Sequence, residues 1–241
     1  MTTIEHKYQT EYRNIFEKYF SESLKEETSK PVETGPYISI SRDFGCMANV
    51  IAQKLAVTLT RINKSKGVEK EWQWLNKSLL QESAKALELS PSKIEYVFHS
   101  KRKTMMEEVV SAMATRYYKS DRKIRKTITD VIRSIAVTGN VIIVGRGGVA
   151  FKNDNPQSLH IKLVAPIEWR VEKISQNYHK SKGEALKRIL EIDHERKYLI
   201  DSFMGYTTDE TLFDVVFNRS TMDDDMIISS VLSVLEKKHL I

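Results

Sequence analysis

The sequence predicts an α/β fold built on a parallel sheet. Short apolar runs alternate along the chain with longer segments of helical periodicity. Strands that alternate with helices favour right-handed crossovers and a parallel sheet covered on both faces. The runs VIIVG and LHIKLV are also dense in β-branched and aliphatic residues, as strands buried on both faces require.

The elements are expected in a simple order, with a main domain over 37–241. An amphipathic helix over 4–24 and a linker rich in charge and proline come first and make up residues 1–36. Strands are expected at 37–41, 72–75, 141–145, 159–164 and 213–217, with 72–75 at an edge. Helices are expected at 48–59, 77–89, 167–178, 182–203 and 223–240, with a further pair spanning 92–137.

Length and composition narrow the class of protein. The chain has 241 residues, of which 41% are hydrophobic, enough to bury a sizeable core. No segment resembles a signal peptide or approaches the roughly 18 apolar residues of a membrane span, so we expect a cytoplasmic protein with no membrane contact. One cysteine and six scattered histidines predict neither a disulfide framework nor a metal site.

The positive charge indicates an anionic partner but does not identify it. The formal charge is +6, and the segment 101–126 holds nine basic residues against three acidic ones. Nucleotide binding, nucleic-acid binding and solubility are all compatible with this excess. Because aromatic interleaving in the segment is limited to Tyr117 and Tyr118, solvated basic helices are favoured over a nucleic-acid site.

The first candidate site follows the first strand, because ligands of open α/β sheets bind beyond the carboxyl ends of strands. Gly45 permits a sharp turn, and the helix after it presents free N–H groups and its positive dipole end. Arg42 and Asp43 bring a basic group and a carboxylate to the same mouth. The alternative is a tight strand-to-helix connection without a ligand, beside a surface ion pair.

A second candidate is VGRGG at 144–148, where Gly145, Gly147 and Gly148 surround Arg146. Glycines let a backbone approach a ligand closely, and an arginine fork matches phosphate bidentately. The alternative is a glycine-rich turn with an incidental arginine.

A third candidate lies on the helices after the fourth strand. Arg170 is in the first of them, and Arg188 and Arg196 are expected to share a face of the second because eight residues separate them. Asp193 precedes Arg196 at i, i+3. These residues would form a basic clamp over a polyphosphate or, alternatively, helix-stabilising ion pairs.

Several motifs together resemble the bacterial cytidylate kinase-like family of P-loop nucleoside monophosphate kinases. They are, in order, ISISRDFG with the helix after it, VIIVGRGG, LHIKLVAPIEWRVEKI, EALKRILEIDHERKYLIDSFMG and FDVVFNRSTM. The resemblance runs from about residue 37 to the C-terminus. It implies a three-layer fold with a five-stranded parallel sheet of order 2-3-1-4-5, a helical nucleoside-monophosphate-binding region at 72–118 and a lid at 184–205.

The resemblance also implies a function and residue roles: phosphoryl transfer from ATP, with Mg²⁺, to an acceptor such as CMP or dCMP. Arg146, beside Gly147, matches the arginine that holds the acceptor phosphate. The lid residues around the transferred phosphoryl group would be Arg170, Arg188, Asp193 and Arg196. The phosphate loop would comprise Arg42, Asp43, Gly45, Cys46, Met47, Ala48 and Asn49.

The phosphate loop departs from the family pattern. Where members typically read F-G-S-G-G-R, this chain has Phe44, Gly45 and then Cys46 to Asn49, so two glycines of the turn are lost. The family itself already lacks the lysine of other phosphate loops, and this chain offers no Ser/Thr ligand for magnesium here. Met47 and Ala48 are expected to bring side chains toward a bound phosphate. The alternative function is therefore a nucleotide-binding or regulatory protein that keeps the kinase fold. The N-terminal helix packs on its own chain or mediates a dimer.

Overall fold

The computed structural model describes residues 35–76, 121–145 and 147–241. The expected helices at 4–24 and 77–89 lie outside the described residues, as do Arg146 and the first part of the expected helix pair. Most of the 72–118 region is therefore not described.

The sheet is parallel, and its strand order β2-β3-β1-β4-β5 confirms the expected 2-3-1-4-5 topology. The central strand β1 (Tyr37–Arg42) pairs with β3 (Val141–Val144) on one side and with β4 (Ser158–Val164) on the other. The edges are β2 (Gln73–Leu75) and β5 (Val215–Asn218). The switch in strand order thus places the carboxyl end of β1 between those of β3 and β4.

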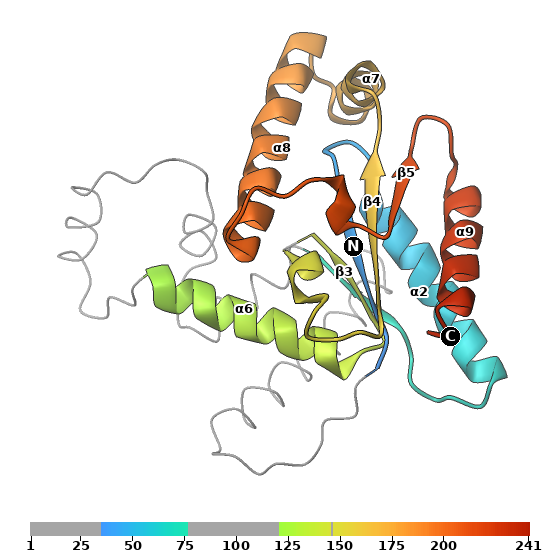
Figure 1. Ribbon diagram of the computed structural model, residues 1–241. Helices are drawn as coiled ribbons and strands as arrows, with labels where there is room; N and C mark the ends of the chain where they lie inside the picture. Colours follow the sequence, from blue (N-terminus) through green and yellow to red (C-terminus); the bar gives the residue numbers. More distant parts are fainter. Residues whose placement is uncertain (1–34, 77–120, 146) are drawn as a thin grey trace.

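One face of the sheet is covered by α2 (Ala48–Ser65) and α9 (Asp224–Lys237), which lie side by side (Figure 1). Their apolar faces pack on β1, β3 and β4. The residues buried in this core include Ile51, Leu55 and Leu59 of α2, Ile227, Val231 and Leu235 of α9, and Ile38, Ile40, Ile142 and Ile161 of the strands. This core anchors the helix that follows the first candidate loop.

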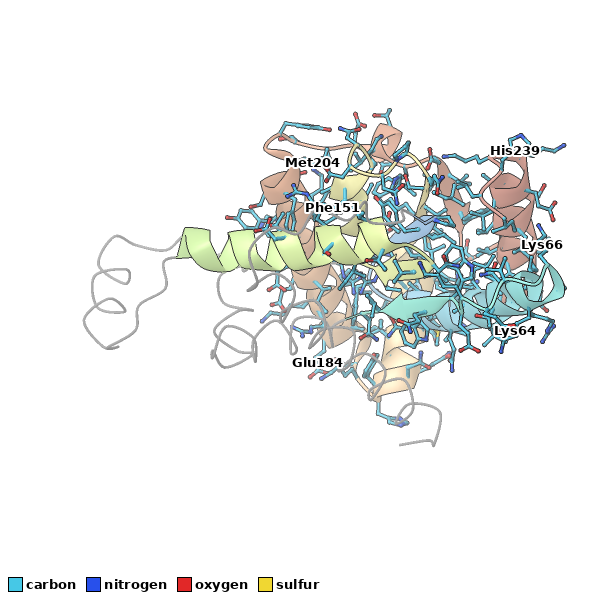
Figure 2. All side chains as sticks on the ribbon, turned by 90° about the horizontal axis from the view of Figure 1, so that it is seen from below. Lys64, Lys66, Phe151, Glu184, Met204 and His239 are labelled. Carbon is cyan, nitrogen blue, oxygen red and sulfur yellow. The ribbon has the colours of Figure 1, made fainter. Side chains whose placement is uncertain are left out.

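The opposite layer contains α6 (Asp121–Thr138), the short 3₁₀ helix η1 (Gly148–Phe151) and α8 (Lys182–Met204). Seen from below in Figure 2, Lys64 and Lys66 at the end of α2 lie on the same side as His239, away from Phe151 of η1 and Met204 of α8. The α7 helix (Ile167–Tyr178) joins β4 to α8 and packs against α8. The fold therefore has the three layers that the resemblance implied.

Element ends follow local chemistry. A capping box between Ser181 and Glu184 starts α8, and Gly205 in the left-handed conformation ends it. The last strand begins two residues later than expected, because Phe213 closes a 3₁₀ helix, η2 (Glu210–Leu212), before β5 starts. The backbone N–H of Phe213 donates to the carbonyl of Glu210 at 3.1 Å.

A buried polar group lies inside the sheet between β1 and β4. His160 is 3% exposed, and its two ring nitrogens lie 2.7 Å from the Ser39 hydroxyl and 2.9 Å from the Ser158 hydroxyl. The ring also makes an edge contact with Tyr37. Burial lowers the pKa of His160 to about 4, although the carboxylate of Asp214 acts in the opposite direction.

His160 predicts a loss of stability in mild acid. The unfolded chain binds a proton at His160 near pH 6.5, whereas the folded chain binds it only near pH 4. The stabilising effect of the neutral ring is therefore complete above pH 6.5 and is lost as the pH falls, by about 3 kcal/mol at pH 4. Urea unfolding at several pH values should show a shallower pH dependence for His160→Gln than for the parent. The exposed His179→Gln should match the parent, and equal slopes for all three proteins would contradict the prediction.

Candidate functional site

The loop between β1 and α2 has the backbone geometry of an anion site. Gly45 has a φ of 100°, and Met47 at the helix N-cap is left-handed, with a φ of 50°. Among the described residues, no acceptor faces the backbone N–H groups of Gly45, Met47, Ala48 and Asn49. Four donors at the positive end of an 18-residue helix can bind an anion without any lysine.

The side chains of this loop point in different directions. Cys46 and Ala48 are buried in the core, and burial raises the pKa of the Cys46 thiol to about 12. The thiol therefore stays protonated and packs in the hydrophobic core. Met47 is 46% exposed and Asn49 is also exposed. The expectation that Ala48 reaches toward a bound phosphate is wrong, because its methyl group faces the core; only Met47 and Asn49 project outward.

The backbone of Phe44 is held from two helices at once. Its N–H donates to Asp193 Oδ1 of α8 at 2.6 Å, and its carbonyl accepts from Arg170 Nη1 of α7 at 3.3 Å. Arg170 and Asp193 also form an ion pair with each other. Arg170 is only 7% exposed, and its Nε donates to the Ala165 carbonyl at 3.0 Å. We call this arrangement of Phe44, Arg170 and Asp193 the loop clamp.

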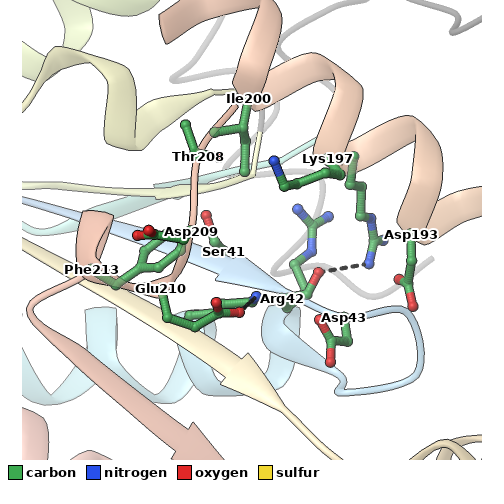
Figure 3. A pocket seen from close by; sticks show the side chains of 12 residues that line it. Ser41, Arg42, Asp43, Asp193, Lys197, Ile200, Thr208, Asp209, Glu210 and Phe213 are labelled. Carbon is green, nitrogen blue, oxygen red and sulfur yellow. Dashed lines mark hydrogen bonds and ion pairs between the residues drawn. The ribbon is translucent and has the colours of Figure 1, made fainter. Parts of the chain in front are cut away.

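Arg196 makes a second connection between α8 and the loop. Its Nη1 donates to the backbone carbonyl of Arg42 at 3.2 Å, the bond dashed in Figure 3. Its guanidinium lies over the Phe44 ring, 5.5 Å from the ring centre, which is the geometry of a cation–π contact. Burial lowers the pKa of Arg196, and the nearby Asp193 partly offsets that effect.

A cavity of about 100 Å³ opens beside this loop, between the sheet and α8 (Figure 3). It is lined by basic and acidic groups together: Arg42, Lys162, Arg196 and Lys197 with Asp43, Asp193, Asp209 and Glu210. Some of these are already paired, since Lys162 bonds Glu210 at 2.6 Å and Lys197 bonds Asp201 at 2.6 Å. The cavity is also lined by Ser41, Ile200, Thr208 and Phe213.

Asp43 is the carboxylate of the loop itself. Burial raises its pKa above the ordinary value even though Arg170, Lys162 and Arg196 all act to lower it. Desolvation is therefore the larger effect. The charged form of a partly buried carboxylate is stabilised by a ligand that donates hydrogen bonds or carries a cation.

The loops after β1 and β3 meet, as the sheet topology predicted. A Cβ on Gly145 would lie 1.8 Å from Arg42 Nη1, so a glycine is required for the guanidinium to rest on the end of β3. Gly147 is left-handed, and a Cβ there would lie 2.5 Å from the ring of Phe203 on α8. These two glycines therefore serve close packing. Arg146 between them lies outside the described residues.

The structure separates Arg188 from the other three residues of this candidate site, Arg170, Asp193 and Arg196. Its side chain is 57% exposed and lies 3.7 Å from Glu191, in an ion pair on the surface of α8. Arg196, which about 80° of helix rotation separates from Arg188, instead bonds the Arg42 carbonyl, so the two arginines do not converge on the loop. Asp193 likewise pairs with Arg170 of α7 rather than with Arg196.

Sequence reasoning missed several residues of the cavity, among them Lys162, Lys197 and Glu210. Lys162 had a usable signal, because it is the one charged residue in the mainly aliphatic strand LHIKLV. Glu210 had none, since its position depends on the path of the chain from α8 back to β5.

The sheet is parallel and has the order 2-3-1-4-5. A turn with helix-terminal N–H donors follows β1, and helices α7 and α8 lie over that turn. These features define the P-loop kinase class of α/β proteins. The chain belongs to the cytidylate kinase-like family, whose model matches residues 37–221. The family and the fold together support a nucleotide kinase as the general class of this protein.

Two cytidylate kinases are similar to this chain at low sequence identity. The chain is 27% identical over 125 residues to a cytidylate kinase of Methanocaldococcus jannaschii, which covers 51% of this chain and 70% of the relative. It is 26% identical over 148 residues to a cytidylate kinase of Sulfolobus acidocaldarius, covering 60% and 79%. An uncharacterized protein from Eubacterium ventriosum has a similar fold, with a TM-score of 0.60 at 18% identity over 84% of this chain and 98% of that one. In the described ranges, no helix combines the length and hydropathy of a membrane span.

The geometry at Gly45 predicts a large cost for adding a methyl group. Gly45→Ala places a Cβ 3.3 Å from the Cβ of the buried Arg170, at a φ that L residues rarely adopt. We expect a loss of about 2–3 kcal/mol in the free energy of unfolding, measured by urea denaturation. Gly67→Ala is the control, because Gly67 has a φ of 75° but nothing within 4 Å. It should lose at most about 1 kcal/mol, and equal losses would show that the contact with Arg170 is unimportant.

Proposed function

We propose that this protein transfers a phosphoryl group from ATP to a nucleoside monophosphate, with CMP or dCMP as the favoured acceptor. The observation that carries the proposal is the set of acceptor-free N–H groups at the start of α2, next to a charged cavity under α8. Family membership supports the same reaction class.

The residues fit the polyphosphate of a donor nucleotide better than they fit an isolated metal ion. The backbone donors of Gly45 and of Met47 to Asn49 would hold phosphate oxygens, with the guanidinium groups of Arg42 and Arg196 close by. The described residues contain no group of three His, Cys, Asp or Glu that would hold a metal. Mg²⁺ is usually bound by substrate phosphates and one or two carboxylates, and Asp43 is the one of the four cavity carboxylates that belongs to the loop itself.

Such a reaction needs positioning and charge neutralisation more than covalent chemistry from the protein. When bound, Mg²⁺ would neutralise charge on the phosphate oxygens. Arg170 would act as a positioning residue, because it holds the loop backbone at Phe44, which Asp193 also bonds when no nucleotide is present. Arg196 spans the loop and α8, so it would contact phosphate from the lid side. By resemblance, Arg146 would bind the acceptor phosphate.

A second candidate function is nucleotide binding without catalysis, and the conformation of Met47 favours it. Met47 is a non-glycine residue in the left-handed region, its side chain is exposed on the loop, and no lysine compensates for it. Losing a charged contact to a transferring phosphoryl group costs about 2.7–4 kcal/mol in activation free energy, by analogy with oxyanion donors. A regulatory protein would tolerate that loss, whereas an efficient kinase would not.

Nucleotide turnover separates the two functions. We expect the purified full chain to convert CMP, dCMP or UMP to the diphosphate with ATP and Mg²⁺, detected by chromatography of the products. Arg146→Ala should abolish turnover, and Arg61→Ala, on the exposed surface of α2, should leave it unchanged. Binding of CMP with no turnover would instead support the regulatory protein.

Met47 offers a matched pair of substitutions. Met47 and His179 are both left-handed, with φ values of 50° and 51°, but only Met47 lies on the loop. Replacing either by glycine should raise stability by about 0.5–1 kcal/mol, because relief of the left-handed strain exceeds the extra entropy of the unfolded chain. Only Met47→Gly should also tighten ATP binding in calorimetry, since it uncovers the loop. If His179→Gly changed ATP affinity equally, the effect would not come from the loop.

A further inference from the structure

The carboxylate of Asp193 lies where several anion-binding groups converge. The N–H of Phe44 donates to its Oδ1 at 2.6 Å, and the guanidinium of Arg170 pairs with its Oδ2. Arg196, one helical turn further along α8, adds a second positive charge close by. A backbone N–H together with two guanidinium groups is also a donor set that suits phosphate.

Arg170 requires an anion in this position. It is 7% exposed, and within the described part of the chain its ion-pair partner is Asp193. A buried guanidinium that loses its counter-charge is strongly unfavourable, so the site is stable only when some anion fills it. Asp193 itself keeps 26% of its side chain exposed, which leaves a route by which another anion can replace it.

The three members of the loop clamp belong to different elements. Phe44 is on the loop and Arg170 on α7, whereas Asp193 is carried by α8, the main helix of the lid segment. Departure of the Asp193 carboxylate would thus break the hydrogen bond from α8 to the Phe44 backbone and the ion pair to Arg170, while Phe44 and Arg170 stay bonded to each other. The contact of Asp193 with Phe44 and Arg170 therefore couples the position of α8 to the binding of a ligand at the loop.

We propose that Asp193 is an internal anion that occupies a phosphate subsite formed by Phe44 N–H and Arg170, and that a phosphate group of the ligand displaces it and releases α8. This inference rests on the proposed binding of nucleotide phosphate at this mouth, and it adds a means of regulation. The site is self-occupied when no nucleotide is bound, so the apparent affinity for phosphate includes the cost of displacing the carboxylate.

A different role for Asp193 makes the opposite prediction. If Asp193 only positions Arg170 for contact with phosphate, removal of the carboxylate loosens Arg170 and weakens phosphate binding. If Asp193 competes with phosphate, removal of the carboxylate leaves the buried Arg170 without its ion-pair partner, with only the partly buried Asp43 carboxylate nearby, and strengthens phosphate binding. The sign of the change in affinity therefore decides between the two roles.

The test compares Asp193→Asn with the parent chain by isothermal titration with pyrophosphate and, separately, with ATP. We expect Asp193→Asn to bind pyrophosphate about tenfold more tightly. Its melting temperature should be lower without ligand and should rise more steeply with added pyrophosphate. The control is Glu191→Gln, which removes the same charge from the exposed ion pair with Arg188 on the same helix. Unchanged or weaker pyrophosphate binding by Asp193→Asn would overturn the proposal.

A measurement on the parent protein covers the case in which Asp193→Asn does not fold. Hydrogen exchange with and without pyrophosphate should show slower exchange at residues 44–49 and faster exchange in α8 around Asp193. Slower exchange in both segments, or no change in either, would overturn the displacement. If Asp193→Asn binds pyrophosphate more tightly but no protein turns over ATP, the internal anion stands and the proposed kinase reaction fails. If turnover occurs without this gain in affinity, the reaction stands and the internal anion fails.

Discussion

The backbone of Phe44 is the point on which the geometry of the candidate site depends. Its N–H and its carbonyl are taken by Asp193 and Arg170, which come from two helices that follow the fourth strand. Because this peptide is fixed, the next residues turn sharply at Gly45 and enter α2 with their N–H groups exposed. Burial of Arg170 makes the arrangement expensive to disrupt, so the loop has little freedom to take another shape.

The same contacts link the loop to α7 and α8. In a phosphate loop with a lysine, the charge of the ligand is met mainly from the loop itself. Here the positive charges near the loop are those of Arg42 at the end of β1 and of Arg170 and Arg196 on the helices above it. Occupancy of the loop and position of α8 are then parts of one equilibrium. Lys162 and Glu210 belong to the same cavity but bond to each other, whereas burial raises the pKa of Asp43 on the loop.

Family membership and the altered loop point in partly different directions. The sheet order and the match over residues 37–221 are those of a kinase-type protein. The loop, however, keeps one glycine where members have more, and it has a methionine in a left-handed position. Cys46 and Ala48 are harmless substitutions because their side chains fill the core under the turn. The change that bears on phosphate chemistry is therefore concentrated at Met47 and Asn49, the two exposed positions.

The sequence by itself determined the parallel α/β fold, because apolar runs such as VIIVG and helical periodicities are local signals that hydrophobic burial enforces. It also located the loop at Gly45, since a strand that runs into a glycine and a helix places donors at the sheet edge whatever the rest of the chain does. Only the tertiary structure decided which side chains of the candidate site bond to one another. Asp193 is three residues from Arg196 in sequence, yet it bonds Phe44, which is 149 residues away. Helix rotation turned Arg188 to solvent, and the return of the chain to β5 brought Glu210 to Lys162. Side-chain pairing across elements depends on how helices pack on the sheet, and no local pattern in the chain encodes that geometry.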